Sequence, residues 1–147
     1  MITVNQHFVI IPNDYNEAGK ASSNIKRTLK KMKYSWELIK RVSVAAYEAE
    51  INIVIHSFGG YADFKIDDDV IYLQFIDCGP GIVDINLAMQ EGYSTATEEN
   101  RLNGFGAGMG LKNIKKSADD MILVSDCNGT VLKLKFQIRE EDKNAGL

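Results

Sequence analysis

The hydrophobic period changes from 3.6 to 2 near residue 60, and that change restricts the fold more than any other feature. Between residues 16 and 57 apolar side chains recur every three or four positions, which is typical of amphipathic helices. From Tyr61 they alternate with polar ones, which is typical of half-buried strands. With 147 residues, 45% hydrophobic and 25% charged, the chain has the size and composition of one soluble globular domain. The pattern therefore predicts an α+β domain.

The same pattern predicts the individual elements. We expect a strand over 2–11, helices over 16–33 and 35–57, strands over 61–67 and 70–76, helices over 84–90 and 109–117, and strands over 121–125 and 130–138. Ser35 is a suitable N-cap and Gly59-Gly60 a suitable stop for the second helix, and Asn128-Gly129 is a typical hairpin turn.

The order strand, two helices, hairpin, helix, hairpin predicts a two-layer α/β sandwich. Its sheet is expected to be mixed but mostly antiparallel, with the helices on one face. Residues 1–138 form the expected domain, and residues 139–147 are expected to be a disordered tail.

Glycines are crowded between Gly79 and Gly110, where seven of the twelve lie. Asn103 to Leu111 carries a glycine at every second position from Gly104 and leads into an expected helix. Exposed amides and a helix N-terminus together favour phosphate, so this stretch is a candidate phosphate cradle, with a flexible linker as the alternative. The preceding residues 91–106 are expected to form a long loop, either a functional lid or a disordered insert.

Two other groups of residues can carry chemistry. Glu48 and Asn52 lie one helical turn apart, where a carboxylate can act as a general base and an amide oxygen can bind Mg²⁺; the alternative is a solvated helix face. Asp77 ends an apolar strand just before Gly79-Pro80-Gly81. There a carboxylate can accept a hydrogen bond from a flat ligand such as adenine, unless the segment is a plain turn.

In this order the motifs resemble those of the GHKL ATPases (gyrase, Hsp90, histidine kinase, MutL), which have the Bergerat nucleotide-binding fold. The resemblance covers about residues 5–138: residues 48–52 are similar to the N box, 77–81 to the G1 box and 106–110 to the G2 box. The small anti-sigma-factor serine/threonine kinases are the most similar members. Their helix also carries a histidine four residues after the asparagine, here His56, and Tyr93-Ser94-Thr95 resembles part of their lid.

The resemblance implies a role for each matching residue. Glu48 would be the general base, Asn52 would bind Mg²⁺, and Asp77 would bind the adenine amine with the support of Thr130. The other implied nucleotide-binding positions are Gly79, Gly81, Ile82, Ser94, Thr95, Gly106, Ala107, Gly108, Met109, Gly110 and Leu111. Ala96 stands where many relatives have a lid lysine, which leaves Arg101, Lys112 or Lys115 as candidates for the cationic phosphate contact.

The implied activity is phosphorylation of a serine or threonine on a small regulatory protein by Mg-ATP. Two alternatives stay open, a nucleotide-gated switch that sequesters a sigma factor or other regulator with little or no kinase activity, and a detached histidine-kinase catalytic domain. Eight of the 17 lysines and arginines lie between Lys20 and Arg41, either as a basic patch for an acidic partner or as a solvated face. The resemblance also implies a homodimer.

The net charge and the lengths of the apolar runs restrict which partners and which cellular location we expect for the chain. A net charge of −3 argues against general nucleic-acid binding. The absence of an apolar run of about 18 residues and of a signal peptide favours a cytoplasmic protein that does not enter membranes. Glu50 lies about 200° around the helix from Glu48, so we expect it to face away and not to act as the base.

Overall fold

The computed structural model describes residues 1–79 and 110–145. Its elements are β1 (Ile2–Ile10), α1 (Lys20–Lys31), α2 (Trp36–His56), β2 (Gly60–Asp67), β3 (Val70–Asp77), α5 (Gly110–Ser117), β4 (Asp120–Asp126), β5 (Gly129–Gln137) and a 3₁₀ turn, η1 (Glu140–Asp142). The five strands form one sheet in the order β1-β2-β3-β5-β4.

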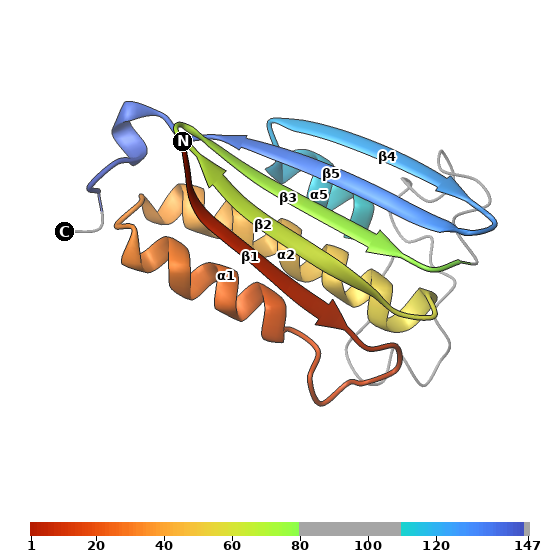
Figure 1. Ribbon diagram of the computed structural model, residues 1–147. Coiled ribbons are helices and arrows are strands. Elements are labelled where there is room, and N and C mark those ends of the chain that lie inside the picture. The colour runs from red at the N-terminus through yellow and green to blue at the C-terminus, as the bar shows by residue number, and fades with distance from the viewer. Residues whose placement is uncertain (80–109, 146–147) are drawn as a thin grey trace.

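The three helices lie on one face of this sheet (Figure 1). The two-layer α/β sandwich predicted from the sequence is therefore confirmed. One detail of the prediction was wrong: every strand pair in the described part of the chain is antiparallel, so the sheet is not mixed there. The pairs β2–β3 and β4–β5 are hairpins, whereas β1 pairs with β2 after the chain has passed through α1 and α2, and β5 returns to pair with β3.

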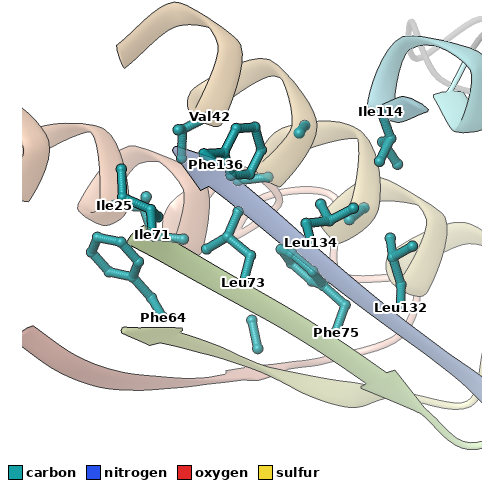
Figure 2. Packing of buried hydrophobic residues seen from close by; sticks show 14 of the residues in the cluster. Ile25, Val42, Phe64, Ile71, Leu73, Phe75, Ile114, Leu132, Leu134 and Phe136 are labelled. Atoms are coloured by element: carbon teal, nitrogen blue, oxygen red, sulfur yellow. The ribbon is translucent and has the colours of Figure 1, made fainter. Parts of the chain in front are cut away.

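The core fills the space between the two layers. Alternate residues of β2, β3 and β5 point toward the helices, and the apolar stripes of α1 and α2 meet them, as Figure 2 shows. The most deeply buried members include Ile25, Leu29, Leu38, Val42, Phe64, Ile71, Leu73, Leu134 and Phe136. Ile114 of α5 joins the same cluster, so α5 packs on the body of the domain. The core therefore sets the position of the polar side chains along the edge of α2.

The ends of the two long helices differ in how well the sequence predicted them. Ser35 caps α2 as expected, since its Oγ accepts a hydrogen bond from the Leu38 amide at 3.2 Å. The α1 helix begins at Lys20 rather than near residue 16, because Gly19 adopts a left-handed conformation (φ +94°) before the first turn. No side chain of α1 caps its own N-terminus.

Part of the segment expected to be a disordered tail, within residues 139–145, is ordered. Residues 140–142 form η1, and Asp142 is buried at 6% exposure. Its carboxylate accepts hydrogen bonds from the Ser35 hydroxyl (2.6 Å) and the Arg139 amide (3.0 Å), and its carbonyl accepts one from the Ser35 amide (2.8 Å). The segment is thereby held at the start of α2. No helix in residues 1–79 or 110–145 is long and apolar enough to cross a membrane.

Candidate nucleotide site

The polar edge of α2 lies against the start of α5. Ala45 and Ala49 of α2 are buried, whereas Glu48 and Asn52 are half-buried at the edge of that face. A Cβ atom placed on Gly110 would lie 3.2 Å from Glu48 Oε2 and 3.4 Å from Asn52 Oδ1. The structure thus brings together three of the residues that the sequence singled out. A Cβ at this position would lie tightly against the Glu48 carboxylate.

Two opposing effects act on the acidity of Glu48. Burial raises the pKa of its carboxyl group, and a hydrogen bond from the side chain of Asn113 works in the opposite direction. The net effect is a raised pKa, which strengthens the carboxylate as a base. Sequence reasoning missed Asn113. The available signal was its spacing, because it follows Gly110 by three residues and therefore lies on the same face of α5.

A second polar group lies at the ends of β3 and β5. The Thr130 amide donates a hydrogen bond to Asp77 Oδ1 at 3.0 Å, and the Thr130 hydroxyl lies 2.7 Å from that of Ser125. The resemblance implied that Thr130 supports Asp77 in binding adenine, and the structure shows that the two residues are in contact through the Thr130 backbone amide. Burial raises the pKa of Asp77, and the hydrogen bond from Thr130 opposes this rise.

Backbone contacts position this second group. The Gly79 amide donates to the carbonyl of Asn128 at 2.8 Å, and a Cβ on Gly79 would lie 2.8 Å from the carbonyl oxygen of Cys127. Gly129 has φ +147°, and a Cβ there would overlap the carbonyl oxygen of Asp77. Close approach of the β4–β5 hairpin to the end of β3 is therefore possible only with glycine at these positions.

The end of α2 connects the two groups. The Phe58 amide donates to the Cys78 carbonyl at 3.1 Å, and the Cys78 amide donates to the Gly59 carbonyl at 3.0 Å. Asp77 therefore lies beside the end of the helix that carries Glu48 and Asn52. His56, in the last turn of that helix, is half-buried, and burial lowers its pKa.

Several predicted residues lie outside the described part of the chain. These are Gly81, Ile82, Ser94, Thr95, Gly106, Ala107, Gly108 and Met109, together with the expected helix over 84–90, the loop 91–106, and Ala96 and Arg101. Among the described positions, Leu111 is buried in the core at 8% exposure, so its side chain anchors α5. Lys115 of α5 is exposed.

Glu50 faces away from Glu48, as expected, and has a different function in the fold. Its carboxylate is 3% exposed and accepts hydrogen bonds from the backbone amides of Gly19 (3.0 Å), Ala21 (3.2 Å) and Ser22 (3.0 Å). It therefore provides, from α2, the N-terminal cap that α1 lacks. The lack of a capping side chain before the apolar stripe of α1 was the only signal in the sequence.

A groove runs between α1 and α2 beside Glu48. Its volume is about 300 Å³, and it is lined by Ser22, Ser23, Lys26, Ser43, Val44, Tyr47 and Glu48. The Lys26 ammonium group lies over the ring of Trp36, 5.1 Å from its centroid. Trp36 is 57% exposed, so it belongs to the surface rather than to the core. Glu48 can thus be approached from the α1 side of the domain.

Known proteins provide a comparison for this arrangement. The chain is 31% identical over 107 aligned positions to an anti-sigma F factor of Geobacillus kaustophilus (strain HTA426), a match that covers 68% of this chain and 70% of the relative. The chain belongs to the anti-sigma F factor family.

Other members of the anti-sigma F factor family are similarly related. The protein of Geobacillus sp. (strain WCH70) is 29% identical over the same shares of the two chains. That of Bacillus velezensis (strain DSM 23117 / BGSC 10A6 / LMG 26770 / FZB42) is 29% identical over 103 positions, covering 65% of this chain and 67% of the relative. No family model matches the chain.

Proposed function

We propose that this chain is an ATP-dependent protein kinase of the GHKL type that phosphorylates a serine or threonine of a small regulatory protein. The observation that carries the proposal is the placement of Glu48 and Asn52 against the glycine that opens α5. A base, an oxygen ligand for a hard cation and a helix N-terminus that attracts phosphate then lie together, with Asp77 beside the end of the same helix.

The donor set fits ATP and Mg²⁺. Asn52 presents an amide oxygen, a ligand type that Mg²⁺ accepts, and the Glu48 carboxylate beside it stays available as the base. A Cβ on Gly110 would fill the space beside these oxygens, so the glycine keeps the approach to them open. When bound, ATP supplies the phosphoryl group and Mg²⁺ neutralises phosphate charge, and positioning provides most of the remaining catalysis.

The residues of the chain would act as follows. Glu48 accepts the proton of the attacking hydroxyl at its carboxylate, a role that its raised pKa favours. Asn52 offers its side-chain oxygen to Mg²⁺. Asp77, with Oδ1 held by the Thr130 amide, accepts a hydrogen bond from the adenine amine. The amide of Gly110 belongs to the first turn of α5, where the helix dipole favours phosphate.

A partner surface follows from the basic character of α1. Arg27, Lys30 and Lys31 are exposed, and Lys26 lies over the exposed ring of Trp36. Because the relatives are named for an anti-sigma activity, we propose a sigma factor as one partner and a small acidic regulator as the phosphorylated one, with the chain acting as a homodimer. Reversal of Lys26, Arg27 and Lys30 to glutamate should weaken the association, and the wild-type complex should weaken as salt increases.

The kinase proposal is tested with the partner itself. The chain is used to capture proteins from its host with ATP and with ADP, and the captured protein is then incubated with labelled ATP and either wild type or Glu48→Gln. We expect label on serine or threonine with wild type only, while both proteins bind nucleotide equally in calorimetry. Equal labelling by Glu48→Gln would exclude Glu48 as the base.

The relatives' name also favours a second function, because an anti-sigma factor is defined by binding rather than by catalysis. In that case the chain is a nucleotide-gated switch that holds a sigma factor and transfers little or no phosphate. The same experiment separates the two functions. Nucleotide-dependent capture without any labelling of the captured protein would support the switch, whereas acid-labile label on a histidine would indicate a histidine-kinase catalytic domain.

A further inference from the structure

Helix α5 is fixed along α2 at two points. Along its first half, the Leu111 and Ile114 side chains enter the core, and Ile114 is fully buried. At its C-terminal end, Arg41 Nη1 of α2 donates a hydrogen bond to the Ser117 carbonyl at 3.2 Å and lies 3.5 Å from Asp119 Oδ1. These contacts set both the position and the rotation of α5 relative to α2.

This rotation directs one face of the first turn of α5 at Glu48. Gly110 and Asn113, three residues apart, share that face. A Cβ on Gly110 would lie 3.2 Å from Glu48 Oε2, and the Asn113 side chain makes a hydrogen bond to the same carboxylate. The carboxylate is therefore held between its own helix and α5. The other titratable side chains that line the groove with Glu48 are Lys26 and Tyr47.

We propose that Asn113 is a positioning residue that holds the Glu48 carboxylate against the first turn of α5. The inference rests on the proposed function in that Glu48 is taken as the base of phosphate transfer. Asn113 does not react and does not take up the proton. It restricts the rotamers of Glu48 and stabilises the ionised form, so that the base keeps one orientation relative to the helix end that would bind phosphate.

The first test measures the contact without any activity. Urea unfolding is compared for wild type, Glu48→Ala, Asn113→Ala and the double variant, with Lys116→Ala, exposed on the same helix, as the matched control. We expect the effects of the first two substitutions on the unfolding equilibrium constant to be coupled by about five-fold or more. A coupling below about two-fold would overturn the proposal, whatever the activity of the chain is.

The second test separates positioning from a merely structural role. With the captured partner and labelled ATP, Asn113→Ala should lower kcat about ten-fold, the change expected for the loss of a hydrogen bond to a charged group, while nucleotide affinity stays within two-fold. The acidic limb of the kcat profile should move to higher pH, because the ionised base has lost a donor. If Asn113→Ala changed neither kcat nor the position of the acidic limb of the pH profile, the proposal would be refuted. If wild type itself transfers no phosphate, the kinase proposal fails and the unfolding cycle alone decides the role of Asn113.

Discussion

Removal of the Glu50 carboxylate should destabilise the fold strongly, although this residue takes no part in the proposed chemistry. Glu50 is 3% exposed and accepts three backbone hydrogen bonds, from Gly19, Ala21 and Ser22, at 3.0–3.2 Å. These amides belong to the start of α1, where an intrahelical acceptor is lacking. Glu50→Ala would leave all three without their acceptor in a buried place.

The size of the effect follows from these contacts. A buried donor that loses its partner costs about 1–3 kcal/mol, and a carboxylate at a helix N-terminus contributes up to about 2 kcal/mol more. Water can enter the vacated space and satisfy part of the loss. We therefore expect Glu50→Ala to lower the free energy of unfolding by about 3–5 kcal/mol, a large share of the 5–15 kcal/mol typical of a domain. Glu50→Gln keeps one acceptor oxygen and should cost about 2 kcal/mol.

Urea unfolding followed by circular dichroism measures this difference. The matched control is Glu48→Gln, the same change two residues away on α2, at a carboxylate that does not cap α1. The two glutamine variants should shift stability in opposite directions. A loss below about 1 kcal/mol in Glu50→Ala, or equal losses in the two glutamine variants, would refute the capping role.

Three further predictions concern the site. Because burial raises the pKa of Glu48, its ionised form is less favourable in the folded than in the unfolded chain. Glu48→Gln should therefore raise the free energy of unfolding by about 0.5–1 kcal/mol near pH 7, as substitutions at functional sites often do. Urea unfolding at a series of pH values should show this gain shrink as the pH falls and the carboxyl group becomes protonated in both states. Asp77→Asn should keep its bond from the Thr130 amide and unfold at nearly the wild-type temperature, yet bind ADP at least about ten-fold more weakly in calorimetry; unchanged affinity would exclude Asp77 from the site. Gly129→Ala should lower the free energy of unfolding by more than about 3 kcal/mol, since its Cβ would overlap the Asp77 carbonyl oxygen. A melting temperature within a few degrees of wild type would contradict the close approach of the β4–β5 hairpin to the end of β3.

Features set by neighbouring residues could be predicted well. The alternation of Leu132, Leu134 and Phe136 with polar residues identified β5 and its buried face, because side chains alternate across any strand. Ser35 was recognised as the cap of α2, because a cap bonds to an amide only three residues away. The spacing of Glu48 and Asn52 likewise placed both on one helix face, since four residues complete about one turn.

Features set by distant partners could not be predicted. The cap of α1 comes from Glu50, about thirty residues further along the chain, so the local sequence could not show how the amides at the start of this helix are satisfied. The C-terminal segment looked like a polar tail because the partner of Asp142 is Ser35, 107 positions away. Asn113 passed unnoticed because its partner lies on another helix, and only the packing of α5 on α2 brings it to Glu48.

Glu48 and Glu50 illustrate the difference between features set by neighbouring residues and features set by distant partners. By itself the sequence determined that two chemically identical carboxylates, two residues apart on one helix, must point in nearly opposite directions, because helix geometry is local. Only the tertiary structure decided what each one meets. One faces the glycine that opens α5 and has a raised pKa, and the other is buried under the first turn of α1 as its cap. The difference arises from packing between segments far apart in the chain, which determines both the burial of a charge and the donors that surround it.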